Sequence, residues 1–270
     1  MHAFGGRGVK MNYLVDIDGT LLNGSEPLIG AIEFVDNLNK NAHNYLLMTN
    51  SIKSNKVQQK RLANAGINVE LQKILNPIAA INKYLLDNKI EQVKIIGSES
   101  EIEQIQASNT KMNYDIVILL DFEKSNLGYN DIQGIIDDVE NGKKVITASL
   151  STFYLKEGKK AIDTGAFVQI IENITNTKVA NYGKPSIHYF EIAGNILNTD
   201  KNNIYVIGDD WNTDIVGANE YGAKSILVKT GKYKEKDELK CNPYKTIESL
   251  RYFFKEHLSS SIKCNDESLS

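Results

Sequence analysis

Two aspartates, Asp16 and Asp18, follow the apolar run Tyr13–Val15 and precede Gly19. A short apolar segment that stops near a glycine is typical of a buried strand. The period-two alternation of a strand predicts that both carboxylates face the same side. Like charges in one small space repel each other unless a cation or a proton offsets them, so the pair favours chemistry. Because Asp-x-Asp is also common in solvated turns, the pair alone leaves both interpretations open.

Further polar residues follow other predicted strands or begin predicted helices. Thr49 and Asn50 follow the apolar run Tyr45–Met48, and Lys184 begins a helix expected through Ala193. Asp209 and Asp214 follow the strand expected at Ile204–Ile207. The carboxyl ends of parallel strands face one crevice, where ligands bind.

Each of these features has a plain structural alternative. Thr49 could bond to backbone, Lys184 could be a surface lysine, and Gly208-Asp209-Asp210 could be a turn. Asp210 is left between solvent exposure and a helix-cap role. All four groups of polar residues nevertheless occur at a predicted strand end or helix start, and this agreement favours one shared site.

The residue types predict a phosphate monoester bound beside Mg²⁺. Asp16 is the expected nucleophile and would form an aspartyl-phosphate. Asp18 is the expected general acid and base, which protonates the leaving oxygen and then accepts a proton from water. Lys184 would stabilise the transferred phosphoryl group as a point charge.

The metal and phosphate ligands follow from the same residues. We expect Asp16 and Asp209, with a backbone carbonyl and waters, to hold Mg²⁺, while Asp214 holds metal-bound water. We also expect Asp18 to belong to the metal site. Phosphoryl oxygens would be bound by Thr49 and by backbone N–H groups near Gly19 and Asn50.

Composition narrows the function classes. The 270 residues are 41% hydrophobic, with a formal net charge of −3 and a pI of about 5.9, which argues against a nucleic-acid partner. No apolar run approaches the roughly 20 residues that span a membrane, and the first ten residues lack an apolar signal core. Cys241 and Cys264 suggest a reducing compartment, so a cytoplasmic location is expected.

The order of predicted elements indicates an α/β fold with a parallel, Rossmann-like sheet. From Asn76 the strand and helix pattern restarts without catalytic residue types, which predicts an α/β cap domain inserted over residues 77–178. Residues 11–76 and 179–258 would form the catalytic core. Ser225–Val228 is its expected last strand, followed by an amphipathic helix from Thr246 to Leu258. A flexible arm over residues 1–10 and a disordered tail over residues 259–270 complete the chain.

The chain resembles the haloacid dehalogenase (HAD) superfamily of aspartate-nucleophile phosphatases. Its four motifs are matched, in order, by Asp16-Ile17-Asp18-Gly19-Thr20, Thr49-Asn50-Ser51, Lys184, and Gly208-Asp209-Asp210 to Asp214. The insert, with Asp163–Val168, looks like the cap of the NagD-like branch. Ile226–Tyr233 is similar to the last core segment of that branch, especially in members related to phospholysine phosphohistidine inorganic pyrophosphate phosphatase.

The resemblance implies hydrolysis, because dehalogenases lack the second aspartate and transporting ATPases carry threonine there. The alternatives are a phosphotransferase or phosphomutase, and a non-catalytic phosphate-binding module. The cap segment Thr147–Thr152 departs from the basic or histidine-bearing version of better known members. Specificity is expected near Ser149, Thr164 and Gly165, toward a small phosphorylated metabolite such as a nucleotide or sugar phosphate. The sequence leaves a homodimer open.

Overall fold

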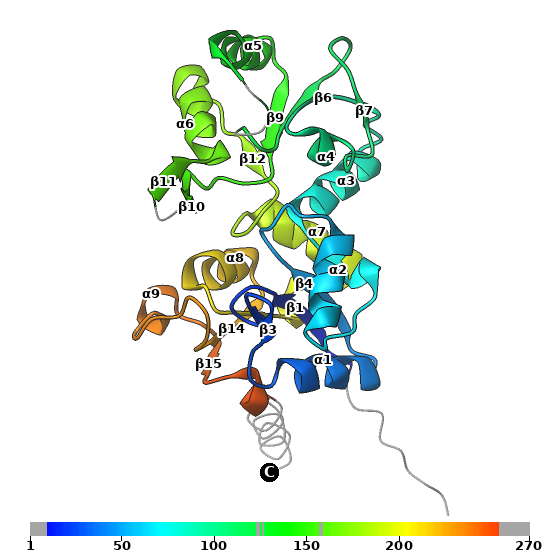
Figure 1. The fold of residues 1–270 in the computed structure, drawn as a ribbon, viewed down its shortest axis with the longest axis vertical. Coiled ribbons are helices and arrows are strands. Elements are labelled where there is room, and N and C mark those ends of the chain that lie inside the picture. Colours follow the sequence, from blue (N-terminus) through cyan, green and yellow to red (C-terminus); the bar gives the residue numbers. More distant parts are fainter. Residues whose placement is uncertain (1–9, 123–124, 126, 157–158, 254–270) are drawn as a thin grey trace, which may run out of the picture. The chain divides into compact units, whose positions relative to one another are not determined.

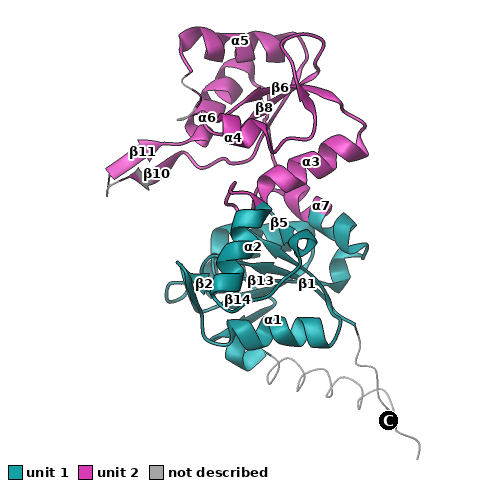
Figure 2. Cartoon of the chain, turned by 45° about the vertical axis from the view of Figure 1, so that its right-hand side comes forward, with its two compact units in different colours: residues 1–49, 55–75, 193–270 teal, residues 50–54, 76–192 magenta. Residues whose placement is uncertain are grey.

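The computed structural model describes residues 10–122, 125, 127–156 and 159–253, and the chain divides into two compact units. Unit 1 comprises residues 1–49, 55–75 and 193–270, and unit 2 comprises residues 50–54 and 76–192 (Figure 2). Each unit contains its own parallel sheet and its own helices (Figure 1). The predicted α/β class with a Rossmann-like core is confirmed.

The sheet of unit 1 has six parallel strands in the order β15-β14-β13-β1-β4-β5. Their bounds are β1 Asn12–Asp16, β4 Asn44–Met48, β5 Ile74–Leu75, β13 Ile204–Gly208, β14 Lys224–Val228 and β15 Lys245–Ile247. The strand β1 lies between β4, which follows it in sequence, and β13, which comes from the far end of the chain. Strand order therefore reverses beside β1, which is where ligands bind in open α/β sheets.

Apolar runs form these strands because both faces of the sheet are covered. On one face, alternate residues such as Val15, Leu47 and Ile207 pack with Phe34 and Leu38 of α1 (Ala31–Lys40). A smaller cluster contains Leu227, Ile215 and Cys241. Helix α2 (Asn55–Asn64) contributes Leu62 to the larger cluster. Burial of the strands leaves their carboxyl ends as the place for polar side chains.

Unit 2 contains a five-stranded parallel sheet in the order β12-β9-β8-β6-β7. Its strands are β6 Gln92–Ile96, β7 Ser108–Asn109, β8 Ile116–Leu119, β9 Lys144–Thr147 and β12 Ala180–Asn181. Its helices include α3 Pro77–Asp87, α4 Glu99–Ile102, α5 Tyr129–Glu140 and α6 Thr164–Thr175. The Asn76 side chain caps α3 by accepting from Ala79 N–H, and a capping box at Ser98 opens α4.

Short elements complete the described chain. They are the hairpin strands β2 Leu22–Asn23 with β3 Glu26–Pro27 and β10 Phe153–Lys156 with β11 Lys159–Ile162, the helices α7 Ile187–Leu197, α8 Val216–Tyr221 and α9 Glu238–Cys241, and four one-turn segments at Leu71–Lys73, Lys201–Asn203, Trp211–Ile215 and Leu250–Tyr252. In the part of the chain that the structure describes, no helix is both long enough and apolar enough to cross a membrane.

Two predicted helices of the final third do not begin where they were expected. Residues Lys245–Ile247 are not helical but form β15, which pairs with β14 and replaces it as the edge strand. The helix expected from Thr246 to Leu258 therefore does not begin at Thr246, because backbone hydrogen bonding to β14 decides the structure of this segment. Its residues 254–258 lie outside the described residues. The helix expected from Lys184 begins only at Ile187, and a π-helical turn at Trp211–Ile215 precedes α8.

The division into a catalytic core and a cap at residues 77–178 stays a prediction. The expected arm lies outside the described residues except for Lys10, and the tail lies outside them entirely. Cys264 also lies there, whereas Cys241 is buried and not disulfide-bonded.

Candidate active site

Three buried aspartates form an acidic cluster in unit 1. Asp16, Asp209 and Asp214 are 7%, 1% and 1% exposed, and each offers a carboxylate oxygen within 4.8 Å of the others. The parallel register pairs Val15 with Ile207, so Asp16 at the end of β1 and Asp209 after β13 lie at the same edge of the sheet. Buried carboxylate oxygens are hard ligands, and this donor set fits Mg²⁺.

Asp209 is held by two donors from separate segments. Its Oδ1 accepts a hydrogen bond from Thr20 Oγ1 at 3.0 Å, and its Oδ2 accepts from the backbone N–H of Lys232 at 2.6 Å. Thr20 is fully buried. Both donors fix the carboxylate and support its negative charge.

Two glycines make room for this carboxylate. A Cβ on Gly19 or on Gly231 would lie 2.2 Å from Asp209 Oδ2, and both glycines have positive φ, at +100° and +54°. Thr230 Oγ1 also donates to the carbonyl of Gly19 at 2.7 Å. The turn after β14 is therefore packed against the turn after β1, and Gly19 is required for close approach.

Asp210 has a structural role that the sequence left open. Its Oδ1 caps the π-helical turn by accepting from the N–H groups of Asn212 and Thr213, and its own N–H donates to Asp214 Oδ2. Lys232 Nζ lies 2.9 Å from Asp210 Oδ2. Burial disfavours both charges, but the hydrogen bond and the attraction between the two charges, with further contacts, together outweigh burial. They hold the pKa of Asp210 below its ordinary value and the pKa of Lys232 above its ordinary value. Asp210 thus positions the turn that carries Asp214.

Asp18 lies beyond β1 and outside the acidic cluster. Its Oδ2 accepts from Thr49 Oγ1 at 3.2 Å, which brings the first two predicted motifs together. Its Oδ1 forms an ion pair with Arg61 at 2.5 Å, and its side chain is 46% exposed. The like-charge pair expected from the sequence is therefore relieved for Asp18 by a guanidinium. A metal role for Asp18 stays a prediction.

Arg61, on α2, also binds the hairpin that follows the first motif. Its Nε and Nη2 atoms donate to the carbonyl of Gly24 at 3.0 and 2.6 Å. Nη1 lies 3.4 Å from Oε1 of Gln58, whose buried Nε2 has no hydrogen-bond partner among the described residues. Arg61 and Lys232 were not predicted as site residues, and Thr20 was named only as the last residue of the first motif. The sequence carries no local signal for the contact of Arg61 with Asp18, because the two residues are 43 positions apart.

Asn50 and Lys184 belong to unit 2. Asn50 Oδ1 accepts from the backbone N–H of Lys184 at 2.7 Å, and Asn50 Nδ2 donates to the carbonyl of the same residue at 2.9 Å. Lys184 is 7% exposed. The second and third motifs therefore meet through a side chain and a backbone, and their predicted phosphate contacts stay predictions.

The expected specificity residues gather in one region of unit 2. The backbone N–H of Gly165 donates to the carbonyl of Ser151, and Ser149 Oγ accepts from the N–H of Ser151. Thr164 Oγ1 donates to the carbonyl of Leu120 at 2.6 Å and is buried. These contacts shape the loops, and a specificity role stays a prediction.

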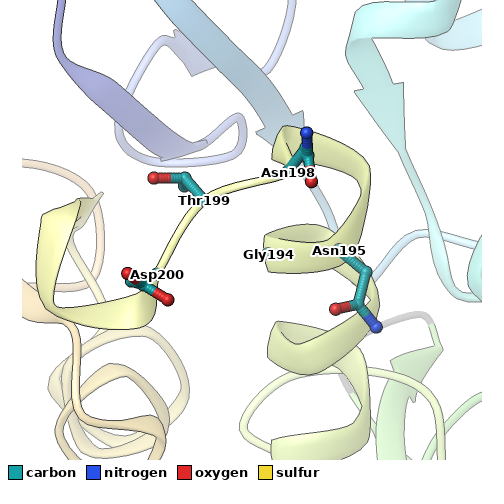
Figure 3. Close-up of a pocket in the computed structure, with 5 residues that line it drawn as sticks. All are labelled: Gly194, Asn195, Asn198, Thr199 and Asp200. Atoms are coloured by element: carbon teal, nitrogen blue, oxygen red, sulfur yellow. The ribbon is translucent and has the colours of Figure 1, made fainter.

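A separate pocket of about 410 Å³ lies in unit 1. It is lined by Gly194, Asn195, Asn198, Thr199 and Asp200 (Figure 3). These residues precede β13, whereas Asp209 follows that strand, so the pocket lies toward the opposite end of β13 from the acidic cluster. None of the predicted site residues lines it.

Family models match two parts of the chain that together hold all four motifs. The haloacid dehalogenase-like hydrolase model matches residues 13–111, and the HAD-hydrolase-like model matches residues 181–252. The chain belongs to the HAD superfamily. This confirms the resemblance drawn from the motifs.

The relatives of this HAD protein include phosphatases, and its fold is similar to that of NagD. It is 26% identical to acid sugar phosphatase of Staphylococcus haemolyticus, over 87% of this chain and 93% of the relative. It is 27% identical to human phospholysine phosphohistidine inorganic pyrophosphate phosphatase, over 87% of each chain. The solved structure of NagD from E. coli K-12 matches with a TM-score of 0.79 at 23% identity, over 90% of this chain and 97% of NagD.

Proposed function

We propose that this phosphatase hydrolyses a small phosphate monoester through a phosphorylated Asp16, with Mg²⁺ as cofactor. The acidic cluster carries the proposal. Burying Asp16, Asp209 and Asp214 within 4.8 Å of one another is costly in the absence of a cation, and a structural role alone gives no reason to keep all three.

In the first step a carboxylate oxygen of Asp16 attacks the phosphorus atom. The bond between phosphorus and the leaving oxygen breaks, and Asp18, which enters this step as the carboxylic acid, gives that oxygen its proton and becomes ionised. Thr49 and Arg61 contact the Asp18 carboxyl group on two sides, so the group has a defined orientation before substrate binds.

In the second step a water molecule attacks the phosphorus of the aspartyl-phosphate. Asp18, now ionised, accepts a proton from this water, and Asp16 leaves as a carboxylate together with inorganic phosphate. Lys184 stabilises the charge of the transferred group in both steps.

Mg²⁺ would be held by Asp16 and Asp209, with Asp214 binding a coordinated water. When bound, it supplies positive charge that offsets the repulsion between the carboxylates and an anionic phosphate. Thr20 and the N–H of Lys232 orient Asp209 for this contact.

The proposed substrates are nucleotide or sugar phosphates. A relative named acid sugar phosphatase supports testing sugar phosphates first. Residues 77–178 would act as a cap domain whose loops near Ser149, Thr164 and Gly165 contact the leaving group.

Replacing the nucleophile tests the proposal. Asp16→Asn should lower the kcat for p-nitrophenyl phosphate by at least ~10⁴-fold, because an amide does not attack phosphorus. Asp36→Asn, which neutralises an exposed carboxylate of α1, is the matched control and should keep wild-type activity. Near-wild-type turnover by Asp16→Asn would contradict the assignment. Release of inorganic phosphate without transfer to an added sugar phosphate separates hydrolysis from phosphotransfer.

A further inference from the structure

Asn50 binds both backbone groups of one residue. Its amide oxygen accepts the N–H of Lys184 at 2.7 Å, and its amide nitrogen donates to the carbonyl of Lys184 at 2.9 Å. These two peptide groups flank the Cα of Lys184 on either side. One planar side chain therefore fixes the backbone on both sides of the atom from which the lysine side chain extends.

The neighbouring residue is held in the same way. Asn181 Oδ1 accepts from the N–H of Gly183 at 3.0 Å, and Asn181 Nδ2 donates to the carbonyl of Gly183 at 2.9 Å. A Cβ on Gly183 would lie 2.7 Å from the carbonyl oxygen of Ala148 and 3.1 Å from Asn50 Oδ1. The backbone at Gly183 and Lys184 is thus confined by two amide side chains and by a close carbonyl.

This confinement matters for a lysine more than for a rigid side chain. The ammonium group is carried on a four-carbon stem with several rotatable bonds, so its position is defined only if the backbone beneath it is fixed. An error of about 1 Å in a group that stabilises a transition state can cost roughly 100-fold in rate.

We propose that Asn50 is a positioning residue for Lys184. Its side chain sets the backbone from which the ammonium group reaches the phosphoryl oxygens, and the side chain itself does not touch the substrate. The inference rests on the proposed function, which gives Lys184 its phosphate. It also gives the Asn50 side chain a role separate from the phosphate contact predicted for the backbone N–H near this residue.

A double-mutant cycle tests this inference. Asn50→Ala should lower kcat/KM for p-nitrophenyl phosphate by about 10 to 100-fold and weaken the binding of orthophosphate in the presence of Mg²⁺, measured by calorimetry. In a Lys184→Ala background the same substitution should cause no further loss, because the group it positions is absent. Additive losses would show that Asn50 acts independently, for example by direct contact with phosphate, and would overturn the proposal.

Asn82→Ala is the matched control. The Asn82 side chain forms a similar two-bond clamp elsewhere in unit 2, donating to the carbonyl of Gln104 at 2.7 Å and accepting from the N–H of Gln106 at 2.9 Å. It should lower the melting temperature without changing kcat/KM. If Asn50→Ala behaves in this way too, its role is only structural and the proposal is wrong.

A second variant covers the case in which Asn50→Ala fails to fold. Asn181→Ala loosens the adjacent clamp and should weaken orthophosphate binding in the same direction, again only when Lys184 is present. Unchanged binding in Asn181→Ala would contradict the inference. If Lys184→Ala binds orthophosphate normally, Lys184 does not bind phosphate and the proposed function is wrong on this point. If Lys184→Ala loses binding while Asn50→Ala does not, only the positioning role of Asn50 is wrong.

Discussion

The Asp209 carboxylate is oriented before any ion binds. Thr20 and the backbone of Lys232 each donate to one of its oxygens, and Gly19 and Gly231 lie against it where a larger residue would collide. Such outer contacts keep a metal ligand in place and raise its affinity for the ion. The acidic cluster therefore predicts a strong dependence of activity on Mg²⁺.

Chelation and ligand replacement test this dependence. EDTA should stop p-nitrophenyl phosphate hydrolysis and Mg²⁺ should restore it, because without the ion the carboxylates repel the phosphate. Asp209→Asn should raise the Mg²⁺ concentration for half-maximal activity by at least ~10-fold, since even outer-shell partners of a metal site contribute that much. Calorimetric titration with Mg²⁺ gives the same comparison without turnover, and Asp36→Asn is again the control. Activity that survives chelation would refute the metal role.

At the scale of elements, Arg61 joins α2 to the hairpin β2–β3 and to Asp18. It donates to the carbonyl of Gly24 on the hairpin while it pairs with the carboxylate. An exposed ion pair alone contributes little to stability, but this one fixes a group that must transfer a proton.

The dependence on leaving group checks this role. Arg61→Ala should lower kcat/KM about 10-fold more for an alkyl phosphate than for p-nitrophenyl phosphate, because an alkoxide needs a proton from Asp18 while nitrophenolate leaves without one. A general loss of phosphate affinity would lower kcat/KM equally for both substrates, so the ratio of the two kcat/KM values would not change. Arg61→Lys should recover part of the loss, and Lys60→Ala, an exposed cation of the same helix, should change nothing. An unchanged ratio in Arg61→Ala would exclude the positioning of Asp18.

In unit 2, Asp138 of α5 makes polar contacts with one residue of strand β6 and with loop residues before β8 and β9. Its carboxylate accepts from Lys94 Nζ at 2.8 Å and from Tyr114 Oη at 3.0 Å, and Lys143 Nζ lies 3.3 Å away. Burial opposes its ionisation, but the hydrogen bonds from Lys94, Tyr114 and Lys143 and the charge of Lys94 together outweigh burial and lower the pKa of Asp138. The ionised form is therefore the one that stabilises the fold.

The lowered pKa fixes the sign of a pH effect. The contribution of Asp138 is complete above its pKa in the unfolded chain and is lost as the pH falls through its pKa in the folded protein. Asp138→Asn should lower the free energy of unfolding by about 1–3 kcal/mol at neutral pH. The difference from wild type should shrink in acid, as measured by urea unfolding over a pH series. Asp137→Asn, at the exposed neighbouring position, is the control. A difference that grows in acid would contradict the assignment.

At the scale of the whole molecule, the strands and the residues at their ends were predictable from the sequence. Buried parallel strands are nearly continuous apolar runs, and Asp16, Thr49 and Asp209 each follow such a run. The acidic cluster then follows from parallel pairing of β1 with β13. These inferences need only local pattern and one topological rule.

The contacts that orient the site were not predictable in this way. Arg61 and Asp18 are 43 residues apart, and Lys232 and Asp209 are 23 residues apart. Each pair is joined only by the packing of whole elements. The strand β15 was missed for the same reason, because its backbone partners lie in β14 and leave no mark in a three-residue segment.

In the proposed mechanism the phosphoryl group is transferred to the carboxylate of Asp16 before water releases it. Wild-type protein turning over p-nitrophenyl phosphate with Mg²⁺ should be quenched and treated with borohydride, which reduces an aspartyl-phosphate to homoserine, and the product located by peptide mass spectrometry. We predict homoserine at position 16, formed only when substrate and Mg²⁺ are both present. Homoserine at another aspartate, or modification of Asp16 in protein that never met substrate, would contradict the account.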